Sequence, residues 1–395
     1  MMRCKISDMK VKDQFFKIIL YLIVAGVLKF VIADQILETN HVWWIQALAI
    51  VIIFGVGMAF VFLGTAKVIE ETTDVLKDRT GLAGGFLQSL GTAFPDMIIG
   101  VMAAILSLQV RDTDYVRAIN LAIIAASATF GSNIYNIFHA VWCIYRQNLA
   151  DLKNKAVLMF PPFKFGGHLL PLKEHKTKPS VREMDGAIRV LSALTLLTAF
   201  VAISMVLFGR VGNLSERFAG DLYQLIRPVG VVLFILCIAV LFYFRKSERP
   251  ESPVEEIAEE ERYYAHRRTA RIWFDLVLSG IAILFAAESM VKAMEIFSQL
   301  THTPFVITGI LAGIIGCMGE MIVVHNFSVN PKGRIGDAVV GVAMDNIVTT
   351  LGASIVALMG GIFLGGNSLI LIFIIILTGN TLLIGQISKL KNRLS

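Results

Sequence analysis

Ten long apolar segments, separated by polar stretches, make up most of this chain. They cover roughly residues 15–34, 43–69, 82–108, 117–145, 187–209, 222–244, 272–297, 304–328, 335–361 and 367–388. Each is long enough for an α-helix that crosses a bilayer, which needs roughly 20 residues. Backbone polar groups in lipid must be satisfied within the segment itself, so we expect these segments to be helices. The pattern predicts an all-α polytopic membrane protein with about ten transmembrane helices.

The polar linkers alternate in charge, and this alternation predicts the orientation of the chain. Linkers 35–42, 298–303 and 362–366 contain no lysine or arginine, whereas the intervening linkers and the C-terminal tail contain most of the basic residues. Basic loops stay on the cytoplasmic side of a membrane. We therefore expect a multi-pass protein of the cell membrane with both termini in the cytoplasm. The exceptions are too few to reverse the bias: Arg111, Arg210 and Arg217.

Composition supports this interpretation and excludes two others. Of the 395 residues, 56% are hydrophobic and 17% are charged, and the mean hydropathy is +0.70, which excludes an ordinary soluble domain. The net charge of +6 comes mostly from the loops between apolar segments. The expected partners are therefore the lipid bilayer and inorganic cations, and no nucleic acid. The four cysteines are scattered, so neither a disulfide framework nor a paired metal motif is expected.

Acidic side chains inside three of the apolar segments are the candidates for chemistry. Asp96, Glu320 and Asp345 lie deep in their segments, where a carboxylate is costly unless it faces a cation, a partner or a water-filled cavity. Pro95 lacks a backbone N–H and is expected to loosen the helix beside Asp96. Carboxylate, hydroxyl and freed backbone oxygens are the ligands that Ca²⁺ and Na⁺ prefer. Polar residues spaced four apart share a helix face, and three such pairs occur here: Thr92 with Asp96, Ser132 with Asn136, and Asp345 with Thr349.

The two halves of the chain repeat one order of features: an apolar span with an amphipathic tail, a short turn, and a helix with a buried acid. Asp96 is the acid of the first half and Glu320 that of the second. The first acid helix is expected to run outward and the second inward, so the halves form inverted repeats with an ion site at their interface. The expected division is 1–42, an N-terminal tail and extra transmembrane helix; 43–245, the first repeat half with a cytoplasmic loop at 147–186; 246–271, a charged cytoplasmic linker; and 272–395, the second repeat half.

Two motifs resemble the sodium/calcium exchanger family, which belongs to the cation/Ca²⁺ antiporter superfamily. Residues 91–96, Gly-Thr-Ala-Phe-Pro-Asp, resemble its Gly-Thr-Ser-x-Pro-Glu motif, and residues 131–136, Gly-Ser-Asn-Ile-Tyr-Asn, resemble its Gly-Ser-Asn-Ile-Phe-Asn. The resemblance covers about residues 43–145 and 272–361 and is degenerate in the second repeat. It implies a set of metal ligands: Ser89, Thr92, Asp96, Ser132, Asn136, Glu320, Asp345 and Thr349.

The chain departs from that family at several positions. Ala93 stands where the family has a hydroxyl, Cys317 stands at the equivalent place in the second repeat, and Gly319 replaces a proline. A glycine also weakens a helix. The lost hydroxyls affect the case for Na⁺ coupling more than the case for divalent-cation binding.

The predicted function is secondary active antiport, in which Ca²⁺ or a similar divalent cation is exchanged for Na⁺ by alternating access. Such a protein is a transporter and not an enzyme, and it needs no cofactor besides its transported ions, Ca²⁺ and Na⁺ or H⁺. The alternative is a divalent cation/H⁺ antiporter. A remote alternative is an intramembrane aspartyl protease, a role for which Asp96 and Asp345 qualify by residue type alone. Two further residues have weaker interpretations, Glu288 as a proton carrier and His325 as a packing or interfacial histidine.

Overall fold

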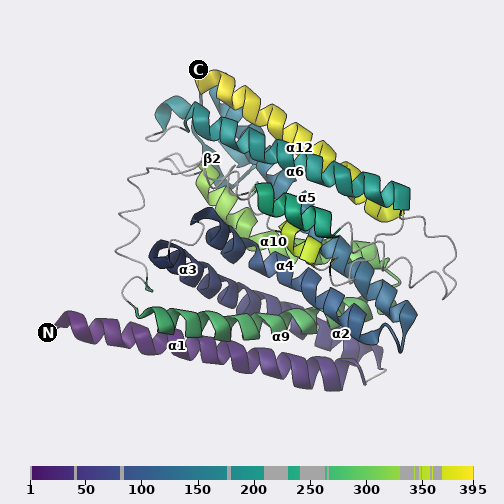
Figure 1. Ribbon diagram of the computed structural model, residues 1–395. Helices are drawn as coiled ribbons and strands as arrows, with labels where there is room; N and C mark the ends of the chain where they lie inside the picture. Colours follow the sequence, from purple (N-terminus) through teal and green to yellow (C-terminus); the bar gives the residue numbers. More distant parts are fainter. Residues whose placement is uncertain are drawn as a thin grey trace. The chain divides into compact units, whose positions relative to one another are not determined.

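The structure, a computed structural model, consists almost entirely of helices (Figure 1). It describes residues 2–39, 42–80, 84–175, 179–208, 230–240, 263–264, 267–329, 342, 347, 349–355, 358 and 367–394. Every predicted segment except 222–244 and 335–361 matches a described helix, and the described parts of those two segments are also helical. The predicted all-α polytopic membrane fold is confirmed.

Several helices are long and apolar enough to cross a bilayer by themselves. Within the described ranges there are five: Gln14–Leu37, Trp43–Thr73, Tyr115–Lys153, Thr269–Thr301 and Ile370–Leu394. A sixth is counted if the two parts of a bent helix, Phe305–Met318 and Glu320–Asn326, form one span. The total of about ten crossings and the inverted relation of the two halves stay predictions.

The chain forms two compact units, and each takes helices from both halves of the predicted repeat. Unit 1 comprises Met1–Ile124 and Arg249–Thr308, and unit 2 comprises Ala125–Glu248 and Gly309–Ser395. The predicted halves follow the order of the chain, whereas the units follow its packing.

Unit 1 is organised around α9 (Thr269–Thr301). The other helices of this unit are α1 (Met2–Val27) with its π-helical continuation η1 (Leu28–Leu37), the run α2 (Trp43–Ile52), η2 (Ile53–Phe62) and α3 (Leu63–Thr80), and α4 (Gly84–Val110). α9 contacts all of them, and Figure 1 shows it beside α1. Ala282, Ala286 and Ala287 on α9 are fully buried, and such small side chains let membrane helices approach closely.

Unit 2 contains most of α5 (Tyr115–Lys153) and α10 (Phe305–Val329), both of which begin in unit 1. It also contains η3 (Leu172–Glu174), α6 (Val181–Phe208), a helical stretch at 230–240, and α12 (Asn367–Leu394). α6 and α12 pack side by side (Figure 1). Polar bonds join the C-terminal end of α12 to its neighbours: Lys391 Nζ lies 2.6 Å from Asp185 Oδ1, and Arg393 Nη1 donates to the Asn148 carbonyl at 2.6 Å.

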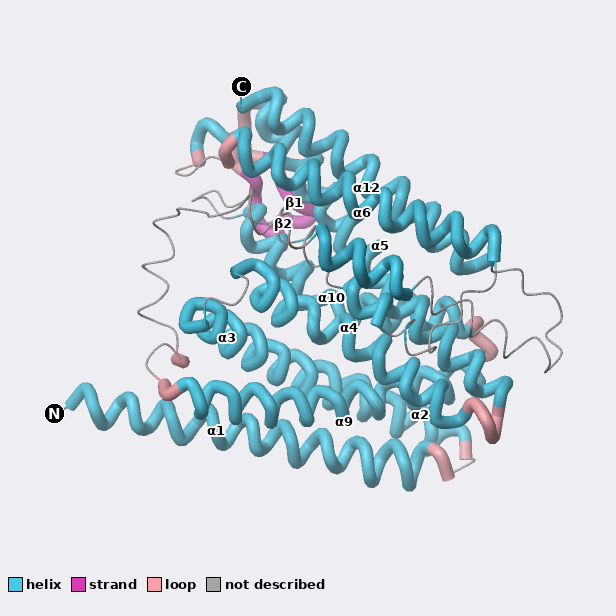
Figure 2. The backbone as a smooth tube through the Cα atoms, viewed as in Figure 1, coloured by secondary structure: helices cyan, strands magenta, loops and turns pink. Residues whose placement is uncertain are grey.

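The predicted cytoplasmic loop 147–186 contains an element that the sequence analysis missed. Two antiparallel strands, β1 (Val157–Phe160) and β2 (Phe163–Leu169), form a hairpin, drawn in magenta in Figure 2. Val157 lies opposite Leu169, and Phe160 lies opposite Phe163. A helical membrane fold therefore carries a small β-hairpin between α5 and α6.

Candidate functional site

The candidate site lies in unit 2, where the backbones of α5 and α10 come into direct contact. A Cβ atom added to Gly313 on α10 would lie 2.6 Å from the Ser132 backbone nitrogen and 2.9 Å from the Ala128 carbonyl oxygen on α5. Only glycine fits at this point, because any side chain would overlap backbone atoms that cannot turn away. The contact fixes the separation of the two helices that carry the predicted ligands Ser132, Asn136 and Glu320.

α10 is bent close to its predicted acid. Its two parts, Phe305–Met318 and Glu320–Asn326, meet at 53°, and Gly319 lies at the break. Sharp bends of helices usually occur at glycine or proline, so the bend agrees with the weakening expected at Gly319. Glu320 is the first residue after it.

Pro95 behaves differently from Gly319. α4 is helical over the whole of Gly84–Val110, so the loosening that we expected at Pro95 does not interrupt the helix. A proline removes one backbone hydrogen bond, and membrane helices accommodate this loss by small local adjustments.

Asn136 and Glu320 form the centre of the site. The side-chain nitrogen Nδ2 of Asn136 donates a hydrogen bond to Glu320 Oε2. Both residues are enclosed, with 1% of Asn136 and 4% of Glu320 exposed. Two members of the predicted ligand set, one on α5 and one on α10, are thus in direct contact.

The amide oxygen of Asn136 indicates what this contact could bind. Asn136 Oδ1 is buried and has no hydrogen-bond partner among the described residues. Buried polar atoms are nearly always satisfied, so such an oxygen calls for a donor or a cation. An amide oxygen beside a carboxylate is a typical donor pair for a hard cation.

Two more predicted ligands lie in this unit. Ser132 is fully buried and donates its hydroxyl hydrogen to the Thr129 carbonyl at 2.8 Å. Its oxygen retains lone pairs that can accept or coordinate. Thr349 is buried in the helical stretch 349–355. Neighbouring Asn133, which was not in the predicted set, is buried, and its Oδ1 has no described hydrogen-bond partner.

The rest of the predicted set cannot be placed around Glu320. Ser89, Thr92 and Asp96 belong to the backbone of α4, but their side chains lie outside the described residues, as does the whole of Asp345. Within the described part of the chain, no group of three or more His, Cys, Asp or Glu residues is positioned to hold a metal ion.

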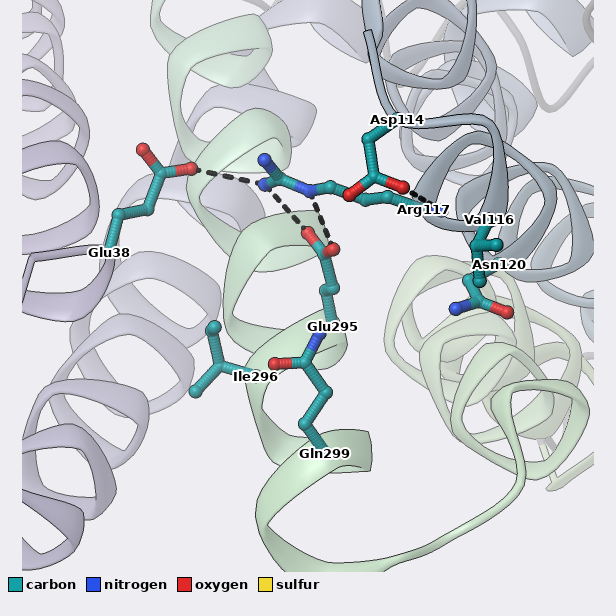
Figure 3. A pocket seen from close by; sticks show the side chains of 8 residues that line it. All are labelled: Glu38, Asp114, Val116, Arg117, Asn120, Glu295, Ile296 and Gln299. Atoms are coloured by element: carbon teal, nitrogen blue, oxygen red, sulfur yellow. Dashed lines mark hydrogen bonds and ion pairs between the residues drawn. The ribbon is translucent and has the colours of Figure 1, made fainter. Parts of the chain in front are cut away.

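A second polar cluster, which the sequence analysis did not predict, lies in unit 1. Arg117 on α5 forms a two-bond fork with Glu295 on α9, with Nε–Oε1 and Nη2–Oε2 distances of 2.7 and 2.9 Å. Its Nη2 also lies 3.3 Å from Glu38 Oε1. These groups line an open pocket of about 500 Å³ (Figure 3), together with Asp114, Val116, Asn120, Ile296 and Gln299.

Ion pairs continue from this pocket along α9. Lys292 Nζ lies 2.6 Å from Asp34 Oδ1 and 3.2 Å from Glu38 Oε1. Lys29 Nζ lies 2.6 Å from Glu288 Oε2. Glu288, considered above as a proton carrier, is thus the partner of a lysine on η1. Sequence spacing gave no signal for these pairs, because their members lie far apart in the chain; Asp34 and Lys292, for example, are 258 residues apart.

Comparison with known proteins identifies the fold more closely. No protein-family model matches the chain, and no curated protein matches it. Among solved structures, the chain is similar to one titled "Crystal Structure of H+/Ca2+ Exchanger CAX". The sequence identity is 14%, the TM-score is 0.54, and the match covers 88% of this chain and 76% of that one. A structure titled "Structure of native YfkE" matches at 13% identity and a TM-score of 0.48, over 92% of this chain and 98% of that one.

The first of these matches describes the fold. The chain is a polytopic membrane protein, and its fold is similar to that of this solved exchanger. The particular match is an H⁺/Ca²⁺ exchanger, whereas the sequence motifs resembled the sodium/calcium branch.

Proposed function

We propose that this protein is a secondary antiporter that exchanges Ca²⁺, or a similar divalent cation, for H⁺ by alternating access. The observation that carries the proposal is the enclosed Glu320–Asn136 pair in a fold similar to that of an H⁺/Ca²⁺ exchanger. On this proposal the chain belongs to the cation/Ca²⁺ antiporter superfamily. The proton-coupled alternative is thus better supported than the sodium-coupled exchange that we first expected.

The pair suits an exchange between a proton and a divalent cation. A buried carboxylate is costly when it is ionised and alone, so Glu320 favours two states, one with a bound proton and one with a bound cation. Asn136 fits both, because an amide has donors for a carboxylate and an oxygen for a protonated carboxyl or a metal. An apolar partner could serve neither state.

The remaining predicted ligands keep their roles within this proposal. Asp96 would supply the second carboxylate, and Asp345 the third. Neutral oxygens would complete the site, from Ser89, Thr92, Ser132 and Thr349. The missing hydroxyls at Ala93 and Cys317 favour proton coupling over Na⁺ coupling, because Na⁺ needs additional oxygen ligands. The similarity to a transporter fold argues against the aspartyl protease.

Transport by purified protein in liposomes tests the proposal. We expect ⁴⁵Ca²⁺ uptake to be driven by an imposed pH gradient in Na⁺-free buffer. Glu320→Gln should reduce uptake at least about tenfold, since a lost charged ligand costs more than about 1.4 kcal/mol of binding. Asn136→Ala should also reduce it.

Glu174→Gln is the matched control, because Glu174 is exposed in η3 and the same carboxylate becomes the same amide. This variant should transport like the natural protein. Uptake that needs a Na⁺ gradient and ignores the pH gradient would refute proton coupling. Full uptake by Glu320→Gln would refute the site.

A further inference from the structure

The β1–β2 hairpin covers the ends of the two helices that carry Asn136 and Glu320. α5 and α10 run parallel in unit 2, because His139 meets His325 and Cys143 meets Ser328 beyond the Asn136–Glu320 contact. Both helices therefore end on the same side, and the loop charges predict that this side is the cytoplasmic one. The hairpin follows α5 directly in the chain and lies at this end of unit 2 (Figure 2).

Side chains of α5 hold the hairpin by its backbone. Trp142 Nε1 donates to the Met159 carbonyl at 3.0 Å, and Arg146 Nε donates to the Leu158 carbonyl at 2.9 Å. These bonds do not involve a group that titrates near neutral pH. The attachment of the hairpin to α5 is therefore expected to be independent of pH.

The hairpin approaches α10 at two points, with Gly167 close to Val329 and Phe160 close to His325, and only the second point includes a group that titrates near neutral pH. The ring of Phe160 lies almost parallel to that of His325, with centroids 5.6 Å apart at 7°. Gly166 has a φ of +94°, and a Cβ atom added there would lie 2.6 Å from the Phe160 ring and 3.5 Å from His325 Cε1. His325 also bonds to the Gly166 backbone. The hairpin is closely fitted to this one imidazole.

A second histidine lies on the other side of the first. The rings of His139 and His325 are stacked with centroids 6.1 Å apart at 26°. His139 Nε2 lies 3.7 Å from Cys143 Sγ, and the ring bonds to the Met321 backbone. Phe160, His325 and His139 thus form a stack that joins the hairpin, α10 and α5.

Repulsion between the two histidine rings makes a second proton on this stack unfavourable. The elements that form the stack also carry other titratable or charged groups: Cys143 and Arg146 on α5, Glu320 on α10, and Lys164 and His168 on the hairpin. One imidazolium is tolerated, because a cation can lie over the Phe160 ring. Two imidazolium rings in contact repel each other, and the stack contains no carboxylate between them.

We propose that residues 157–169 form a clamp across the ends of α5 and α10, and that the clamp opens when both His139 and His325 bind protons. At neutral pH the stack is intact and the clamp is closed. In acid the two rings separate, and the hairpin stays on α5 but releases α10.

The clamp would add a regulatory step to the exchanger. α10 carries Glu320, so release of its end frees the helix whose movement would open the site to that side. The pH on the hairpin side would then control access to the site, separately from the protons that are exchanged. This consequence depends on the proposed function, whereas the clamp itself does not.

Hydrogen–deuterium exchange of the full-length protein in lipid nanodiscs tests the clamp without any transport. After correction for the intrinsic rate, we expect the amides of residues 157–169 to exchange at least about tenfold faster at about pH 5.5 than at about pH 7.5. The variant His139→Gln/His325→Gln should lose this pH response. Phe160→Ala should exchange rapidly at both pH values.

Two controls separate the histidine pair from other groups. His168→Gln removes the exposed histidine of the hairpin itself and should keep the pH response. Glu320→Gln should also keep the pH response, even if this variant no longer transports Ca²⁺. The exchange experiment therefore tests the clamp even if the proposed function is wrong. If the double variant does not fold, His139→Gln alone should still weaken the response. Two results would overturn the proposal. One is that the exchange rate of residues 157–169 in the natural protein is the same at both pH values. The other is that the double variant still shows the pH response.

Discussion

Gly313 sets the distance between α5 and α10, and a single methyl group there should disturb the ion site. In Gly313→Ala the new Cβ would lie 2.6 Å from Ser132 N, 2.9 Å from Ala128 O and 3.0 Å from Gly131 C. All three are backbone atoms of α5, so no side-chain rotation can relieve the overlap. The helices themselves must move apart.

The size of the movement follows from these distances. Non-bonded heavy atoms are in favourable van der Waals contact at about 3.5 Å or more, so the two helices must separate by about 1 Å. Overpacking of this kind costs about 1–3 kcal/mol of stability. The larger effect is expected on function, because a displacement of about 1 Å at a working site can cost about 100-fold in rate. Asn136 and Glu320 lie one and two turns from the contact and would share the displacement.

The measurement is ⁴⁵Ca²⁺ uptake by proteoliposomes under a pH gradient, together with thermal unfolding in detergent. Gly385→Ala is the matched control, since Gly385 is on α12 and a Cβ atom there would meet nothing within 4 Å. This control should transport normally and be slightly more stable, because alanine is the better helix former. The Gly313→Ala protein should still fold, but its ⁴⁵Ca²⁺ uptake should be about tenfold to 100-fold lower.

A Gly313→Ala protein with the uptake and melting temperature of Gly385→Ala would refute the reasoning. It would mean that the close approach of α5 and α10 has no part in positioning Glu320.

Two further predictions concern the ion pairs of unit 1. Lys29→Met should lower the free energy of unfolding by about 3 kcal/mol, because it leaves the largely buried Glu288 without its cation. In thermal unfolding, the double variant Lys29→Met/Glu288→Gln should recover most of this loss. Equal losses in the single and double variants would contradict the pairing. Arg117→Lys should cost about 1 kcal/mol, because an ammonium cannot reproduce the two-bond fork to Glu295. Unfolding of Arg117→Lys identical to that of the natural protein would show that this fork contributes nothing.

The helices were predictable because lipid leaves a chain few alternatives. A long apolar segment must satisfy its own backbone, so composition and length give the element and its approximate ends. For the same reason Glu320 could be identified from sequence, since an acid in such a segment needs a cation, a partner or a cavity. The contact between Glu320 and Asn136 was not predicted, because the motif resemblance implied only that both residues belong to one ligand set.

The helix bends were only partly predictable. Pro95 and Gly319 both weaken a helix, yet the helix around Pro95 continues and the helix at Gly319 bends by 53°. Local preference says where a bend is permitted. The packing of neighbouring helices decides where it occurs.

The ion pairs and the hairpin were not predictable, for two physical reasons. Arg117 and Glu295 are 178 residues apart, and a charge pattern along one sequence does not say which opposite charges will meet. The hairpin strands are short, with four and seven residues, and they are held by side chains of α5 and α10 rather than by their own propensity. A loop between two membrane helices gives no sign of such external support.

The ion pairs of α9 also couple two helices mechanically. Glu288 and Lys292 lie on successive turns of α9 and bind Lys29 and Asp34 of η1 at 2.6 Å each. Two ion pairs on successive turns oppose sliding and rotation of η1 against α9, so we expect the two helices to move as one rigid body. A movement of α9 would therefore move η1 with it, and a spectroscopic probe attached to η1 would detect that movement.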